Sequence, residues 1–156
     1  MGDHAVTHCQ PRLQKVIDGE QGGISKDVEW GGGGGVKVYR LGEAAFDADG
    51  RINKAIKFPH LAAHIWFAET KSALKSPAKS PLLGVHNDTA FYLLYNGILG
   101  DKRPDGGNVL TSKILESLPP HNGQRVIYGE SSRIGAVRLA RENIVFKQTP
   151  YDVKAR

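Results

Sequence analysis

The sequence predicts an α/β fold. We expect a three-layer unit with a mainly parallel sheet in residues 82–156, preceded by an irregular glycine-rich segment, one strand and one helix. Strand-like and helix-like patterns alternate through residues 82–156, which is typical of βαβ units with parallel strands. With 156 residues, 40% of them hydrophobic, the chain is long enough to bury a core as one globular unit overall.

Residues 1–35 are predicted to form a poorly structured lead with one short helix. The stretch PRLQKVIDG favours the helix, because Pro11 suits a first turn, apolar residues from Leu13 to Ile17 share a face, and Gly19 ends it. The following EQGGISKDVEWGGGGG is polar and rich in glycine, so we expect a loop there.

Residues 36–75 are predicted to hold a strand and a helix. VKVYRLG alternates between two faces, as a strand does, and FDADGRINKAIKF is rich in turn residues. PHLAAHIWFAET indicates a helix, with Pro59 in its first turn and apolar residues at helical spacing. Residues 76–81, rich in Pro, Ser and Lys, are interpreted as a linker.

Residues 82–156 are predicted to form the α/β subdomain. PLLGVHNDTAFYLLYNG indicates two strands around a tight turn at Asn87-Asp88. Thr111 is expected to cap the helix SKILESL, which ends at the Pro-Pro pair. QRVIYGE is then a strand, SRIGAVRLAREN a helix, and IVFKQTPYDV the last strand.

Right-handed crossovers should bring the ends of three strands to one edge of the sheet, just before Asn96, Glu130 and Gln148. In open parallel sheets, ligands bind at that edge.

The composition excludes several kinds of site. One cysteine, Cys9, forms neither an internal disulfide nor a Cys-rich zinc site, and we expect a cytoplasmic protein with no signal peptide and no membrane span. His60 and His64 have metal-ligand spacing but no third ligand is evident, and the acidic turn at 47–50 lacks the ligands of a calcium loop. We therefore expect no metal.

The run Gly31–Gly35 resembles a cofactor loop only in composition. A cradle for a dinucleotide or a methyl donor needs a strand before the glycines and a helix after them. Here the glycines follow a polar loop and precede a predicted strand. We interpret them as a flexible entry to that strand.

The loop YGESSRIG joins a predicted strand to a predicted helix, so it is better placed for chemistry. Ser131 or Ser132 is expected to cap the helix. The alternative is a nucleophile, but the Gly-x-Ser-x-Gly elbow would need glycine where Arg133 stands. LPPH likewise lacks the polar residue and the aromatic that flank the Pro-Pro of amino-methyltransferases, at Leu118 and His121.

Six blocks lie between about Arg12 and Arg156: RLQKVIDGEQGGISKDVEWGGGGGVKVYRLG, HIWFAET, SPLLGVHNDTAFYLLYNGIL, GGNVLTSKILESLPPH, RVIYGESSRIGAVRL and IVFKQTPYDVKAR. Together these blocks resemble the C-terminal part of adenine-specific DNA methyltransferases, of the modification-subunit type found in type III restriction–modification systems. The resemblance covers nearly the whole chain between those two residues.

The resemblance implies transfer of a methyl group from S-adenosylmethionine to the exocyclic amine of a flipped adenine in DNA. In this branch of the family the catalytic motif, the target-recognition region and the cofactor loop lie upstream of the matched part. We therefore assign no catalytic, cofactor-binding or metal residue, and expect the chain alone to bind no cofactor and to be inactive. Its expected partners are the rest of the methyltransferase or a restriction subunit.

Two other functions remain open. The net charge of +5 permits a free-standing interaction module that docks to a restriction or methylation subunit or to DNA. The candidate contacts to DNA or a partner are Lys37, Arg40, Arg133, Arg138 and Arg141. The other alternative is a small α/β enzyme that uses the YGESSRIG loop.

Overall fold

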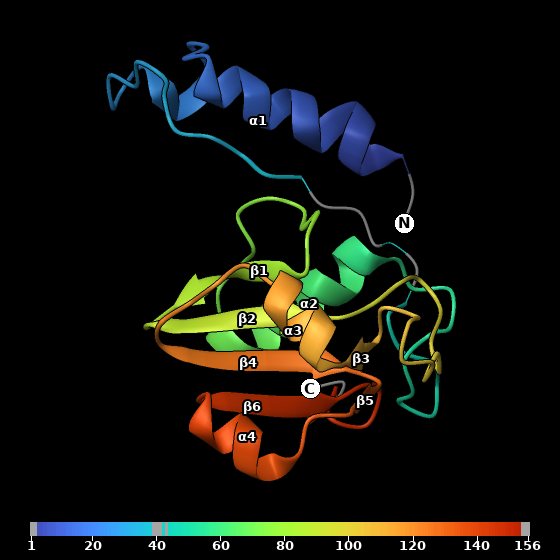
Figure 1. The fold of residues 1–156 in the computed structure, drawn as a ribbon. Coiled ribbons are helices and arrows are strands. Elements are labelled where there is room, and N and C mark those ends of the chain that lie inside the picture. The colour runs from blue at the N-terminus through green and yellow to red at the C-terminus, as the bar shows by residue number, and fades with distance from the viewer. Residues whose placement is uncertain (1–2, 39–41, 43, 154–156) are drawn as a thin grey trace. The chain divides into compact units, whose positions relative to one another are not determined.

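The computed structural model describes residues 3–38, 42 and 44–153 (Figure 1). The chain divides into two compact units, Met1–Glu43 and Ala44–Arg156. Each unit is described by itself below.

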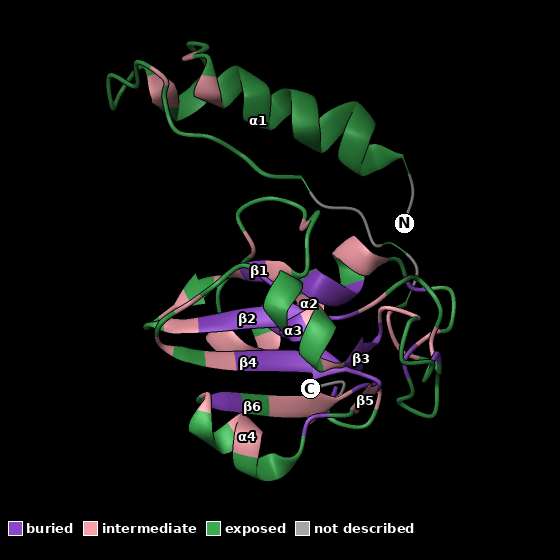
Figure 2. Cartoon of the chain, in the orientation of Figure 1, coloured by how far each residue is buried: buried purple, intermediate pink, exposed green. Residues whose placement is uncertain are grey.

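The first unit contains η1 (Ala5–Cys9), α1 (Gln10–Ile17) and η2 (Gly23–Ser25). α1 is the helix expected from the sequence, with its proline in the first turn. None of these helices buries a residue, and α1 is exposed except at its last residue, Ile17, which is intermediate (Figure 2). The strand expected at 36–41 is not seen in Val36 to Val38, which form no regular element, and residues 39–41 lie outside the described part of the chain.

The glycine run closes the C-terminal end of α1. The amide of Gly33 donates to the carbonyl of Ile17 at 2.8 Å, and Trp30 Nε1 donates to the carbonyl of Val16 at 2.7 Å. A Cβ on Gly32 would lie 2.7 Å from the Ile17 oxygen, so glycine is required for this approach. These bonds satisfy carbonyls that a helix end leaves without partners.

The second unit is built on a mainly parallel four-stranded sheet of order β1-β2-β4-β6, as the sequence predicted. Its strands are β1 (Leu82–His86), β2 (Thr89–Leu93), β4 (Gln124–Gly129) and β6 (Ile144–Gln148). β1 is antiparallel to β2, whereas β2, β4 and β6 run parallel. Asn87 and Asp88 have φ of 47° and 57°, the left-handed conformation expected at this tight turn.

Helices cover both faces of this sheet, which confirms the three-layer prediction (Figure 1). α2 (Phe58–Thr70) packs on Phe91 and Leu93 of β2, while Ala90 and Tyr92 face the opposite layer. That layer contains α3 (Ser112–Ser117) and α4 (Ala136–Arg141). The alternation along β2 follows from the two-residue period of a strand. Within this four-stranded sheet, β2 and β4 are the most buried strands (Figure 2).

The sequence predicted the N-terminal start of α3 correctly but not that of α4. Thr111 caps α3 as expected, its hydroxyl accepting from the amide of Ile114 at 3.2 Å. The last helix does not begin at Ser131 or Ser132, because these residues form β5 (Ser131–Ser132), which pairs with β3 (Val109–Leu110). α4 begins only at Ala136 and has no side-chain cap.

Two further sequence expectations concern turns and membranes. The acidic stretch at 47–50 is a turn in which Asp47 Oδ1 accepts from the amides of Asp49 and Arg51. In the part of the chain that the structure describes, no helix combines the length and the apolar character that a membrane crossing requires.

Candidate functional site at the carboxyl edge of the sheet

The parallel strands end together at one edge of the sheet, where the sequence placed Asn96, Glu130 and Gln148. Gln148 Nε2 donates to the backbone oxygen of Glu130 at 2.8 Å. The amide of Glu130 donates to the carbonyl of Asn108, whose side-chain oxygen accepts from the amide of Asn96 at 2.6 Å. The three predicted residues therefore do meet, through a fourth residue that the sequence pattern did not single out.

Asn108 ties the loop after β2 onto the end of β4. Its side chain is fully buried and donates from Nδ2 to the carbonyl of Ile98 at 2.8 Å, in addition to accepting from Asn96. Its backbone oxygen lies so close to Gly129 that a Cβ there would be 2.8 Å away. A side chain at position 129 would thus separate the loop from the strand.

Glu130 is directed into this loop rather than into an open site. It is only 1% exposed, and Oε1 accepts from the amide of Gly100 at 2.8 Å. Burial raises the pKa of the Glu130 carboxyl, and the hydrogen bond from Gly100 partly offsets that effect. The carboxyl group therefore holds a backbone amide of the loop after β2.

Asp101 forms a second anchor within the same loop. Arg103 donates to both of its carboxylate oxygens, at 2.9 and 2.8 Å, in a two-pronged contact. Asn96 Nδ2 donates to Oδ2 at 2.6 Å and also to the carbonyl of Gly106. The hydrogen bonds from Arg103 and then Asn96 hold the pKa of Asp101 far below its usual range. These polar groups satisfy one another, so the network can position the loop.

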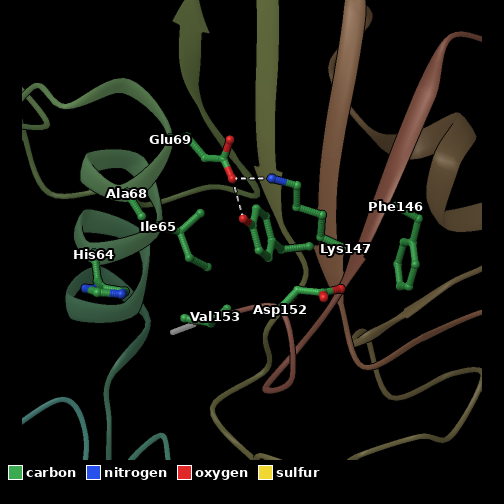
Figure 3. Close-up of a pocket in the computed structure, with 9 residues that line it drawn as sticks. His64, Ile65, Ala68, Glu69, Phe146, Lys147, Asp152 and Val153 are labelled. Atoms are coloured by element: carbon green, nitrogen blue, oxygen red, sulfur yellow. Dashed lines mark hydrogen bonds and ion pairs between the residues drawn. The ribbon is translucent and has the colours of Figure 1, made fainter. Parts of the chain in front are cut away.

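A cleft of about 410 Å³ opens beside this edge, between α2 and the ends of β4 and β6 (Figure 3). Glu69 of α2 accepts from Tyr128 Oη and from Lys147 Nζ, both at 2.5 Å and both on Oε1. The Lys147 ammonium also lies 5.5 Å from the centroid of the Tyr128 ring. His64 and Asp152 complete the polar lining.

The cleft combines a carboxylate, an ammonium, a phenol and an imidazole, and its volume is in the range of small-molecule sites. Glu69 and Lys147 are paired with each other. A polar ligand would therefore have to displace that pair or bind beside it.

The candidate contacts to DNA or a partner fall in different places. Lys37, in the first unit, and Arg133 and Arg141, in the second, have exposed side chains, whereas Arg40 lies outside the described residues. Arg138 is half-buried and bridges two elements: Nε donates to Glu142 at 2.7 Å and Nη1 to Ser112 at 2.6 Å. Arg138 thus joins α4 to the start of α3.

The remaining residues singled out from the sequence have structural contacts or exposed positions. Ser132 exchanges hydrogen bonds with the backbone of Ile134, each 3.1 Å long. His60 is exposed, and the His64 ring packs edge-on to Phe46 at 4.8 Å. Within residues 3–38, 42 and 44–153, no group of three or more His, Cys, Asp or Glu side chains is arranged to hold a metal ion.

Comparison with known proteins gives one partial similarity. No family model matches the chain, and no solved structure matches it. Over 32 residues the chain is 66% identical to the probable type III restriction-modification enzyme HindVI Mod subunit of Haemophilus influenzae (strain ATCC 51907 / DSM 11121 / KW20 / Rd). The aligned segment is 20% of this chain and only 4% of that protein.

Proposed function

We propose that this chain is the C-terminal module, or a fragment, of a site-specific DNA adenine methyltransferase, the modification subunit of a type III restriction–modification system, and that it is inactive alone. The observation that carries the proposal is the local identity of 66% with a Mod subunit. The blocks that resemble the C-terminal part of these methyltransferases support the same assignment.

The carboxyl edge of the sheet supports a scaffold role. Ligands of open parallel sheets bind at this edge. Here the edge holds the loop after β2, through Asn108, Glu130 and Gln148. The methyl donor and the group that orients the target amine are then contributed by another part of the methyltransferase.

In the proposed enzyme, adenine leaves the DNA stack and its exocyclic amine receives the methyl group of S-adenosylmethionine. The described residues would contribute to this reaction indirectly. The sheet, its helices and the anchored loop would provide a surface on which the rest of the enzyme can pack.

The proposal is tested with the purified chain and with the missing part supplied. Isothermal titration with S-adenosylmethionine and a methyl-transfer assay on duplex DNA should both be negative for the chain alone. Co-expression with a type III modification subunit truncated before this region should restore transfer. Binding or transfer by the chain alone would refute its inactivity, and failure of co-expression to restore transfer would refute the module assignment.

The alternative function is a free-standing interaction module that docks to a restriction or methylation subunit or to DNA. Exposed basic side chains such as Arg133 and Arg141 favour it, together with the net charge of +5. If DNA is bound through phosphates, affinity must fall steeply as salt rises. A titration with random-sequence duplex that stays flat at low salt would exclude the DNA partner.

A further inference from the structure

The outer edge of the sheet at β1 carries a groove. Among the residues that the structure describes, β1 pairs with β2 on one side only, so its other side is a sheet edge (Figure 1). Edge strands present backbone N–H and C=O groups that can pair with another chain. Residues 72–80 stand beside this edge and enclose with it a groove of about 810 Å³, with Trp66 among the lining residues. We call this the β1 groove.

β1 itself carries no acidic or lysine side chain of the kind that often protects a sheet edge. Natural edge strands are blunted by charged side chains, often lysine, that lie on the strand. β1 has the sequence LLGVH with no acidic or lysine residue, and Val85 is 51% exposed. Its pairing with β2 shifts register between Leu82 and Gly84. A Cβ on Gly84 would meet the Trp66 ring at 2.8 Å, so the glycine lets β1 pass close to Trp66.

Positive charge is concentrated around the β1 groove. Residues 70–87 contain Lys71, Lys75 and Lys79 and no aspartate or glutamate, which gives this segment +3 of the chain's net +5. All three lysines are exposed, and Lys75 and Lys79 line the groove. The lysines lie on the loop beside the strand edge and not on β1 itself.

We propose that the β1 groove binds an extended acidic segment of a partner protein, which adds to the sheet as a further strand beside β1. Strand addition uses the backbone groups of an open edge for affinity and pockets beside it for side chains. Leu74, Ala78 and Val85 supply apolar lining, and the loop lysines match acidic side chains.

Two other occupants match the β1 groove less well. A second copy of this chain would bring two lysine-rich loops together, and like charges repel. DNA would match the lysines but would leave the apolar lining and the edge amides unused. The inference stands independently of the proposed function, since it rests only on this edge and its charge.

The test uses a fluorescein-labelled peptide of alternating valine and glutamate and fluorescence anisotropy with the full chain. Two comparison peptides are the same sequence with alternate backbone amides methylated, and alternating valine and lysine. The acidic peptide should bind, and methylation should weaken it about tenfold or more, because it removes the donors that pair with a strand edge.

A charge reversal locates the site. Lys75→Glu with Lys79→Glu should weaken the acidic peptide about tenfold. The matched control, Lys54→Glu with Lys113→Glu, makes the same charge change at exposed positions that do not line the β1 groove. It should leave the affinity within about twofold.

Three results would overturn the proposal: no binding of the acidic peptide, equal binding of the methylated peptide, or an equal loss in the control. Tighter binding of a random-sequence duplex that depends on Lys75 and Lys79 would also overturn it in favour of DNA. The methylated peptide tests strand addition on the unmodified chain, so that result does not depend on how the variants fold.

Discussion

Replacing Asn108 with alanine would test whether buried hydrogen bonds hold the loop after β2. The side chain is 0% exposed, and it bonds the amide of Asn96 at 2.6 Å and the carbonyl of Ile98 at 2.8 Å. Asn96 and Ile98 are themselves exposed residues, so water can replace part of what is lost. Each bond then contributes a net of about 0.5–1.5 kcal/mol.

The vacated volume adds on the order of 1 kcal/mol, because a tightly packed interior collapses only in part. The free energy of unfolding of the second unit should therefore fall by about 2–4 kcal/mol. Urea unfolding followed by the fluorescence of Trp66, in a Trp30→Phe background, measures this loss. The amide of Asn96 should also exchange with solvent faster.

Asn122→Ala is the matched control, because Asn122 is an exposed asparagine of the same unit. It should change the free energy of unfolding by less than about 0.5 kcal/mol. If Asn108→Ala costs less than about 1 kcal/mol and leaves the exchange of the Asn96 amide unchanged, the loop is held by something else.

Three further substitutions test other contacts. Because burial raises the pKa of Glu130, its contribution to stability is present at low pH and is lost as pH rises through the raised pKa. Relative to the parent, the Glu130→Gln variant should therefore become more stable as the pH rises from about 5 to about 8, as measured by thermal unfolding scans. If the two proteins instead show parallel curves of stability against pH, this reasoning is contradicted. Thr111→Ala removes the cap of α3 and should cost about 1 kcal/mol in urea unfolding, whereas Thr111→Ser should cost less. Gly84→Ala places a methyl group 2.8 Å from the Trp66 ring, so it should cost about 1–3 kcal/mol and shift the emission of Trp66; an unshifted spectrum would show that the contact is not tight.

The elements of the second unit were predictable because their signals are local. β2 and β4 are runs of apolar residues bounded by turns, and α3 has a capping residue before it and a Pro-Pro pair after it. The start of α4 was predicted wrongly for the opposite reason. Ser131 pairs with Val109, and a contact over that sequence distance leaves no periodic signal near the serines.

The site was predictable in position but not in its contacts. Crossover geometry placed Asn96, Glu130 and Gln148 at one edge, and the structure brings them together. Asn108 was missed, because nothing in GGNVL indicates which backbone groups its amide will meet. Glu69 and Lys147 were missed as well, since 78 positions separate them. The one available signal was the lysine that follows the apolar start of β6.

The glycine run shows that a glycine-rich composition does not reveal which contacts the glycines make in the fold. Five adjacent glycines were interpreted as a flexible entry to a strand, whereas Gly32 and Gly33 close the end of α1. The positive φ of 90° at Gly32 explains why the position suits glycine. The partner, Ile17, is in a separate element, so no local pattern predicts the contact.

The packing of Val153 means that the core around α2 is completed only late in synthesis. Val153 belongs to the same buried cluster as Leu61 and Ile65, although about 90 positions separate it from the first of them. At a translation rate of about 5–20 residues per second, the ribosome makes α2 roughly 5–20 seconds before the valine that completes its cover. During that interval the apolar side of the nascent helix is available to chaperones and to other new chains.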